Sequence, residues 1–281
     1  MQKHLLLTVS DAYKFMDGAR FVGSFFRDKA QIRLTLVHVA PAKGSDPGFE
    51  DKQPTEAECR LLENQALQHA GRFLEESGFS SENVQCQYRT KAMGTAKDIL
   101  HEAEKGKYDA VVLGRRATTR LEEALGGSVS MQVLERERSV PIWICRRIDS
   151  SRSGVLLCLD GSRPSLRMAD HVGFMVQGSG NQPVTMFHVR NKEAGSAEDV
   201  FPRARELLLD NGVDASGISE KEVSGRNVAK AVQQEAREGN YAVVAVGYSG
   251  EGDKGWRSRL ILGSVSKRLS YELQGHSLWI S

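Results

Sequence analysis

Two short glycine–serine segments offer the groups that hold a phosphate. The letters GSVS occur at residues 127–130 and again at 263–266, each time ahead of a helical pattern and a final apolar strand. A glycine-rich turn that enters a helix exposes backbone N–H groups at the positive end of the helix dipole, and serine hydroxyls add further donors. The alternative is structural, because serine is among the best residues for capping a helix and Ser128 and Ser264 stand at the expected caps.

A carboxylate lies at the end of a strand ahead of the second of these segments. Asp160 ends an apolar run in the sequence LCLDGS. An aspartate at the carboxyl end of a strand can accept hydrogen bonds from ribose hydroxyls or an adenine amine. In an Asp-Gly-Ser loop it can equally form an Asx turn, and the local pattern does not decide between the two. The corresponding place near the start of the sequence holds Ser10, followed by Asp11, so the carboxylate there is shifted by one residue.

The sequence repeats itself, and the repeat supplies the elements that position these residues. RLTLVHVA at 33–40 corresponds to PVTMFHVR at 183–190, which is 150 residues later. AKDILHEAEKGKYDAVVLG at 96–114 corresponds to AKAVQQEAREGNYAVVAVG at 229–247, which is 133 residues later. The two GSVS segments lie 136 residues apart, as do PIWI and SLWI. So many landmarks in one order exclude chance and indicate two similar halves.

Each half alternates strands with helices. Apolar runs such as AVVLG and YAVVAVG show little polar alternation, which is typical of strands covered on both faces in a parallel sheet. We therefore predict two doubly wound α/β domains at residues 1–150 and 151–281, each with a five-stranded, mainly parallel sheet and related by a pseudo-twofold axis. The extra residues of the first half fall at 41–58, a stretch rich in proline, glycine and charge that we expect to be a loop.

Both halves resemble the universal stress protein family, and the protein looks like a tandem member of it. The family motif G-x2-G-x9-G-[ST] follows the fourth strand. In the second half Gly247, Gly250, Gly263 and Ser264 match the residue types of the motif, but twelve residues in place of nine separate the second and third glycine. In the first half Ala117 replaces the second glycine, so we expect that site to be degenerate.

For members that bind ATP, the resemblance implies that adenine and ribose lie near the aspartate after the first strand and near the backbone at the end of the second. The phosphates lie on the glycine loop. Carried over to this sequence, the resemblance assigns the following residues of the second half to the nucleotide: Asp160, Val189, Gly247, Gly250, Gly263, Ser264 and Ser266. The corresponding residues of the first half are Val39, Gly114, Gly127, Ser128 and Ser130. ATP, alone or with Mg²⁺, is the expected ligand.

Little in the sequence points to catalysis. His38 and His188 occupy equivalent positions near strand ends, where a single histidine is more often a hydrogen-bonded structural residue. Neither a GxxxxGK[ST] loop nor an SGGxDS-like loop occurs. The leading hypothesis is a stress-response protein that binds an adenine nucleotide in its second domain as a regulatory ligand. Two alternatives stay open, namely an interaction scaffold that binds no nucleotide and a slow ATPase.

Charge and hydropathy exclude several other classes. Lysine and arginine number 38 against 36 aspartate and glutamate, which provides no basic surface for nucleic acid. The apolar runs are too short to cross a bilayer and the first residues show no signal-peptide pattern, so we expect a cytoplasmic protein without a membrane partner. The four cysteines form no C-x-x-C pair, which argues against a zinc site or a disulfide framework.

Each half ends in a strand that carries a tryptophan, Trp143 in VPIWICRR and Trp279 in HSLWIS. A terminal strand leaves an open sheet edge, and domains of the family usually dimerise by pairing their last strands. We expect residues 140–147 to pair with residues 276–281 inside this protein and to bury both indoles. Whether two copies then form a homodimer is left open.

Overall fold

The structure is a computed structural model of the protein. It describes residues 1–10, 16–40, 56–90, 92–114, 129–134, 140–178, 182–190, 197–248 and 263–281. The first half contains β1 (Lys3–Thr8), α1 (Asp17–Phe25), β2 (Ile32–Ala40), α2 (Glu56–Glu76), η1 (Ser81–Asn83), β3 (Val84–Thr90), α3 (Thr95–Gly106), β4 (Ala110–Gly114), α5 (Val129–Leu134) and β5 (Ile142–Cys145). The loop expected at 41–58 extends too far, because α2 begins at Glu56 and residues 56–58 are therefore helical.

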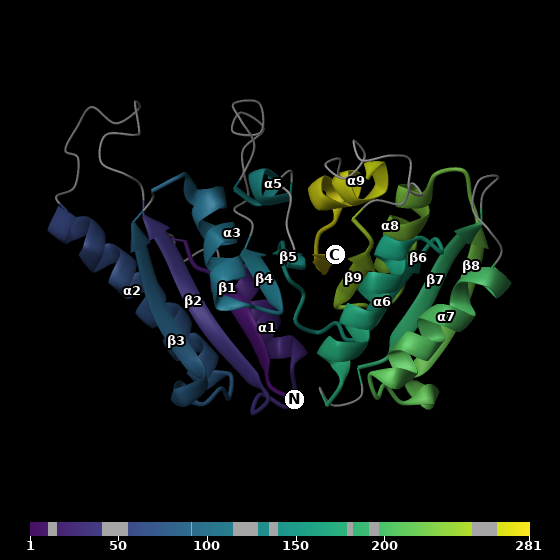
Figure 1. The fold of residues 1–281 in the computed structure, drawn as a ribbon, viewed down its shortest axis with the longest axis horizontal. Helices are drawn as coiled ribbons and strands as arrows, with labels where there is room; N and C mark the ends of the chain where they lie inside the picture. The colour runs from purple at the N-terminus through teal and green to yellow at the C-terminus, as the bar shows by residue number, and fades with distance from the viewer. Residues whose placement is uncertain are drawn as a thin grey trace.

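The second half repeats this order of elements. It contains β6 (Val155–Leu159), α6 (Arg163–Val176), β7 (Val184–Arg190), α7 (Ala197–Asp210), η2 (Ala215–Gly217), β8 (Ile218–Ser224), α8 (Val228–Glu238), β9 (Val243–Val246), α9 (Ser264–Glu272) and β10 (Ser277–Ile280). Within each half the paired strands are all parallel, and Figure 1 shows the two halves side by side with similar shapes. The predicted α/β fold with five strands in each half is therefore confirmed.

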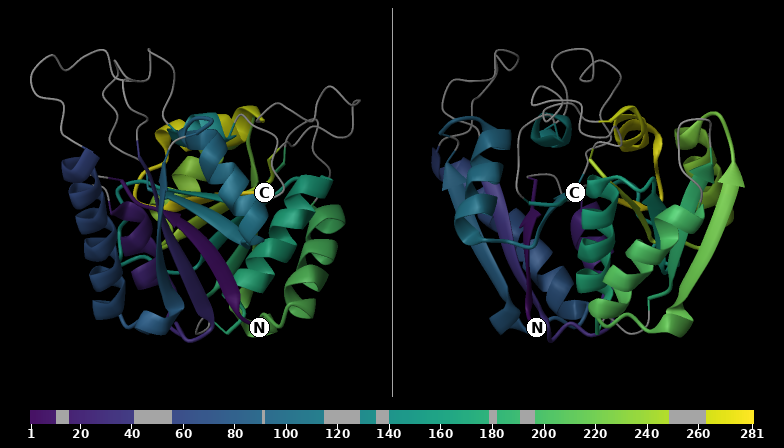
Figure 2. Two further views of the ribbon diagram at one scale, coloured as in Figure 1. Left: turned by 60° about the vertical axis from the view of Figure 1, so that its left-hand side comes forward. Right: turned by 45° about the vertical axis from the view of Figure 1, so that its right-hand side comes forward.

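The ten strands form one continuous sheet. Their order is β3-β2-β1-β4-β5-β10-β9-β6-β7-β8, and the central pair β5–β10 is antiparallel. Helices cover both faces, as the two views of Figure 2 show. One buried apolar cluster lies between the sheet and α1, α2, α6 and α7, and a second lies between the sheet and α3, α5, α8 and α9. Each cluster draws residues from both halves, so the halves share their cores.

Two stacked tryptophans mark the centre of the sheet. Trp143 of β5 is paired with Trp279 of β10, and both side chains are fully buried. Their ring centroids are 4.0 Å apart and their planes differ by 4°. Phe21 of α1 and His171 of α6, which are 150 residues apart, each lie edge-on to both indoles. The pairing of the last strands that the sequence predicts is present, and it places a pseudo-twofold axis at the tryptophan pair.

Candidate functional site

The strand order of the second half directs attention to one edge of the sheet. The polypeptide passes from β6 to β7 and β8 on one side and returns to β9 and β10 on the other, so the order reverses between β6 and β9. Ligands of open α/β sheets bind at the carboxyl ends of strands beside such a reversal. Asp160 follows β6 and Gly247 follows β9, which brings these two predicted site residues to the same edge.

Asp160 forms the Asx turn that its sequence allows. Its Oδ1 accepts the backbone N–H of Ser162 at 3.0 Å and the hydroxyl of Ser162 at 2.6 Å. Ser162 in turn caps α6, because its Oγ accepts the N–H of Ser165 at 3.3 Å. Asp160 is exposed, and among the described residues no hydrogen bond reaches its Oδ2. The turn therefore holds the carboxylate in place and leaves one oxygen for a ligand.

Gly247 is needed for packing, a role that its place in the glycine motif does not imply. A Cβ at this position would lie 2.8 Å from the backbone nitrogen of Ser165 and 2.9 Å from the backbone carbonyl carbon of Pro164. Both atoms belong to the first turn of α6. Contacts this short with backbone atoms are not relieved by rotating a side group, so glycine lets the end of β9 touch α6.

The start of α9 differs from the expected cap. Gly263 is the N-cap residue, it has no side group that could cap the helix, and Ser264 is already the first helical residue. The expectation that Ser264 caps this helix is therefore wrong. The N–H of Lys267 bonds to the oxygen of Gly263 at 2.9 Å, and the three N–H groups before it have no partner inside the helix.

Ser266 has a structural bond that competes with its expected role. It is buried and its hydroxyl donates to the backbone oxygen of Gly247 at 2.8 Å. The hydroxyl hydrogen therefore fastens α9 to the end of β9 and is not free for a phosphate. The donors that the start of α9 offers to an anion are its backbone N–H groups, together with the hydroxyl of the exposed Ser264.

Val189 lies beside Asp160, and Gly250 lies outside the described residues. Leu159 of β6 is paired with His188 of β7, so the next residues, Asp160 and Val189, lie side by side at the end of the pairing. Val189 is buried in the apolar cluster under α8. The structure thus brings together six of the seven residues that the resemblance assigns to the second half.

The two equivalent histidines make the same bond. Nδ1 of His38 lies 2.8 Å from the oxygen of Val9, and Nδ1 of His188 lies 2.8 Å from the oxygen of Leu159. A carbonyl oxygen only accepts, so each Nδ1 carries the hydrogen. Each histidine fastens the second strand of its half to the end of the first strand, which confirms the structural interpretation of this repeated residue.

Comparison with known families and structures shows what this architecture is similar to. Residues 17–146 match the model of the universal stress protein family. This match lies within the first half of the protein, which is therefore similar to that family. A comparison with curated proteins gives no match.

Solved structures match the fold over the whole length of the sequence. A universal stress protein from Archaeoglobus fulgidus is 20% identical, with a TM-score of 0.69, and the match includes 99% of this protein and 95% of that one. A protein of unknown function from Pseudomonas aeruginosa is 13% identical, with a TM-score of 0.60, and the match includes 99% and 92%. Identities this low show the fold alone. The fold of this protein, with its two similar halves, is thus shared with these structures.

The first half of the protein is built differently at the equivalent edge. Gly127 and Ser128 lie outside the described residues, whereas Ser130 is buried in α5. Ser10, which replaces the aspartate, has a buried Oγ that no hydrogen bond from the described residues reaches. Val39 and Gly114 lie near the ends of β2 and β4, as their counterparts in the second half lie at the ends of β7 and β9.

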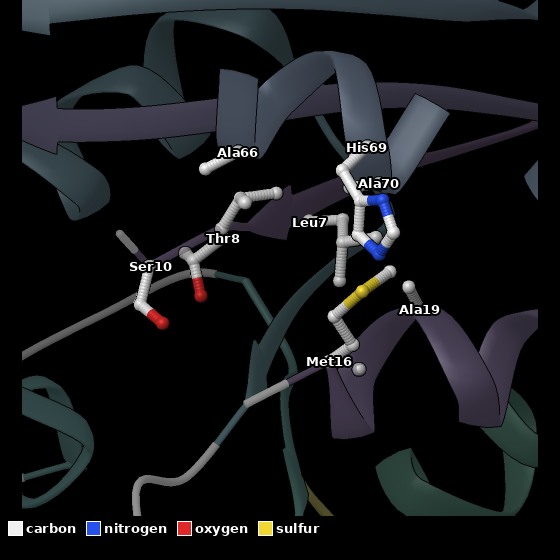
Figure 3. Close-up of a pocket in the computed structure, with 10 residues that line it drawn as sticks. Leu7, Thr8, Ser10, Met16, Ala19, Ala66, His69 and Ala70 are labelled. Carbon is white, nitrogen blue, oxygen red and sulfur yellow. The ribbon is translucent and has the colours of Figure 1, made fainter. Parts of the chain in front are cut away.

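A small cavity lies next to Ser10. It measures about 10 Å³ and is lined by residues of β1, α1 and α2 and of the segments next to β1 and α1, which Figure 3 shows: Leu7, Thr8, Val9, Ser10, Met16, Gly18, Ala19, Ala66, His69 and Ala70. A space of this size holds about one water molecule and no nucleotide. Counting back twelve residues from Gly78 and Gly212, Ala66 stands where the second half has Val200, and this smaller residue leaves room for the cavity.

The thiol next to Asp160 is not suited to nucleophilic chemistry. Burial, and then the charge of the Asp160 carboxylate, raise the pKa of the Cys158 thiol. A thiol of raised pKa stays protonated and is a weak nucleophile. Within the part of the sequence that the structure describes, no group of three or more His, Cys, Asp or Glu residues is placed to hold a metal ion. In the same residues no helix is long and apolar enough to cross a membrane.

We expect Gly247→Ala to lower the free energy of unfolding by about 1–3 kcal/mol, because the new methyl group presses on the backbone of α6. Gly217→Ala is the matched control, since a Cβ at Gly217 meets no atom within 4 Å. Urea denaturation followed by circular dichroism measures both variants. Equal stability of the two variants would show that β9 and α6 are not in the close contact described above.

Proposed function

We propose that this protein is a stress-response protein of the universal stress protein family that binds an adenine nucleotide, ATP, at the carboxyl edge of β6 and β9, and that the nucleotide acts as a regulatory ligand. The observation that supports this most strongly is the position of two complementary groups. Oδ2 of the exposed Asp160 and the backbone N–H groups at the start of α9 lie at the same edge of the second half.

A continuous series of contacts holds these two groups relative to each other. Asp160 is bonded to Ser162, and Ser162 is bonded to Ser165 at the first turn of α6. That turn packs on Gly247, whose oxygen is bonded to Ser266 of α9. The carboxylate and the start of α9 are therefore joined through neighbouring elements that are in direct contact.

The chemistry of the two groups fits the two ends of a nucleotide. A carboxylate oxygen accepts hydrogen bonds from the hydroxyls of a ribose or from an adenine amine. The N–H groups of a helix start, together with the helix dipole, attract a phosphate. Gly263 places no side group between this helix start and a ligand, so a phosphate can approach the backbone closely.

One observation favours an interaction scaffold as the second candidate function. Oδ1 of Asp160 and the hydroxyl of Ser266 are already bonded within the protein, so the edge is stable without a ligand. A slow ATPase is the weaker alternative, because His188 is engaged through Nδ1 and the pKa of Cys158 is raised. Turnover would be observed as ADP released linearly over hours.

The test compares two aspartates that make the same turn. Asp214 accepts the N–H of Ser216 at 2.8 Å and its hydroxyl at 2.7 Å, as Asp160 does with Ser162, but it lies at the start of η2. Calorimetric titration with ATP and Mg²⁺ is expected to show about one nucleotide bound per wild-type molecule. We expect Asp160→Ala to weaken ATP binding by about 10-fold or more, since it removes a charged acceptor, and Asp214→Ala to leave the affinity unchanged.

The outcome separates the candidates. A wild-type protein that binds no ATP, with Asp160→Ala folded normally, contradicts the nucleotide site and favours the scaffold. Equal weakening by Asp160→Ala and Asp214→Ala means that the loss of an Asx turn, and not a contact with the ligand, is responsible. Asp160→Asn retains the turn and removes the charge, so it distinguishes the electrostatic part of binding from the local fold.

A further inference from the structure

Tyr248 joins the candidate site to the other half of the molecule. Its hydroxyl donates to the backbone oxygen of Leu134 at 3.1 Å, and Leu134 is the last residue of α5 in the first half. The backbone oxygen of Tyr248 accepts the N–H of Gly263 at 3.0 Å, and the backbone N–H of Tyr248 donates to the oxygen of Ser281 at 2.7 Å. A single residue therefore contacts the start of α9, the segment after β10 and the end of α5.

The short helix α5 depends on contacts of this kind. It has six residues, and a helix of that length is not stable alone in water. The last carbonyl groups of a helix have no partner within the helix, and the hydroxyl of Tyr248 supplies one for Leu134. Met131 of α5 also touches α9, because its Sδ lies 3.4 Å from the hydroxyl oxygen of Ser270. Figures 1 and 2 show α5 and α9 next to each other across the middle of the molecule.

The same segment fixes the start of α9, where a phosphate would bind. The oxygen of Tyr248 holds Gly263, and the oxygen of Gly247 holds Ser266. An anion on the first N–H groups of α9 would bind between these two bonds. Any change in the position or order of α9 on binding must therefore act on residues 247–248, and through the phenol it must act on α5.

We infer that Tyr248 couples nucleotide occupancy in the second half to the stability of α5 in the first half. This inference rests on the proposed nucleotide site and adds its regulation. Such coupling is reciprocal, so a partner that changes α5 would also change the nucleotide affinity. The aligned residue of the first half, 133 positions earlier, is Arg115, which has no phenol and lies outside the described residues. The coupling therefore runs from the second half to the first through a residue that the repeat does not duplicate.

Hydrogen exchange of the full-length protein, measured by mass spectrometry with and without saturating ATP and Mg²⁺, tests this coupling. The variants are Tyr248→Phe and Tyr241→Phe. Tyr241 is the matched control, because its hydroxyl donates to Glu235 of the same half at 3.1 Å. Without ATP, Tyr248→Phe is expected to speed exchange in 129–134 by about fivefold, which corresponds to one lost hydrogen bond. With ATP, exchange in 129–134 slows in the wild type and in Tyr241→Phe, and it slows less in Tyr248→Phe, in which the contact between Met131 and Ser270 still joins α5 to α9.

Calorimetric titration of the same proteins separates the two proposals. If ATP binds the wild type and residues 129–134 do not respond, the coupling is wrong and the nucleotide site stands. If Tyr248→Phe responds to ATP as the wild type does, the coupling does not pass through the phenol and the inference is overturned. If the wild type binds no ATP, the proposed function and the inference both fail.

Discussion

Trp279→Ala is expected to lower the free energy of unfolding by about 3–5 kcal/mol, as is usual when a large buried aromatic residue is truncated. Trp279 is fully buried and stacks on Trp143 at 4.0 Å. Phe25 also lies edge-on to its ring, with centroids 5.6 Å apart. The substitution removes the centre of the interface between the halves, so both halves are expected to lose stability together. Urea denaturation followed by circular dichroism measures the change.

Trp279→Phe is the control for this prediction. It retains an aromatic ring in the same place, so we expect it to cost less than Trp279→Ala. Other contacts between the halves remain in both variants, including the buried Gln182, which donates to the oxygen of Phe25 at 2.8 Å and accepts the N–H of Gly154 at 2.8 Å. A loss of less than about 1 kcal/mol in Trp279→Ala would mean that the tryptophan pair does not hold the halves together.

The architecture was predictable because it depends on patterns that extend over many residues. Apolar runs without polar alternation indicate strands that are buried on both faces, and β4 and β9 are such strands. The order of the repeated segments then gives two similar halves. The pairing of β5 with β10 follows because a final apolar strand in each half needs a neighbour. None of these steps requires knowledge of a particular contact between residues.

The details of the candidate site depend on contacts that the sequence does not specify. Gly247 is a glycine because Pro164 and Ser165, more than eighty residues earlier, lie against it. Ser266 bonds to the strand end and Ser264 does not cap, because α9 begins one residue earlier than the expected cap implies. The Asx turn at Asp160 is one of two local possibilities. A serine two residues before a proline, as in Ser162 and Pro164, is typical of the start of a helix, and this sequence feature could have indicated the turn.

The repeat also hides a difference between its two halves. Phe21 and His171 occupy equivalent places on α1 and α6, and both lie against the tryptophan pair. The sequence aligns them but does not show that the histidine is buried there. Nε2 of His171 accepts the indole N–H of Trp143 at 3.1 Å, so the ring is neutral and Nδ1 carries the hydrogen. The centre of the interface therefore contains a titratable group in one half and a phenyl ring in the other.

The pH dependence of stability is expected to reveal this histidine. Burial lowers the pKa of His171 to about 3, from 6.5. Because the pKa in the folded protein lies below the unfolded value, folding favours the neutral ring. The contribution is complete above about pH 6.5 and is lost as the pH falls toward 3, at about 1.4 kcal/mol per pH unit.

His171→Phe copies the residue of the first half and removes this titration. At neutral pH the variant is expected to be less stable than the wild type by about 1–3 kcal/mol, because the N–H of Trp143 loses its acceptor. The difference in the free energy of unfolding should shrink and then change sign as the pH falls below 6. Only in the wild type does the unfolded state bind a proton at residue 171 that the folded state does not bind, and this proton favours unfolding. Burial also lowers the pKa of His276, but that residue is present in both proteins and its effect cancels. Urea denaturation of both proteins at several pH values measures the difference, and parallel stability curves between pH 6 and pH 4 would contradict a buried neutral His171.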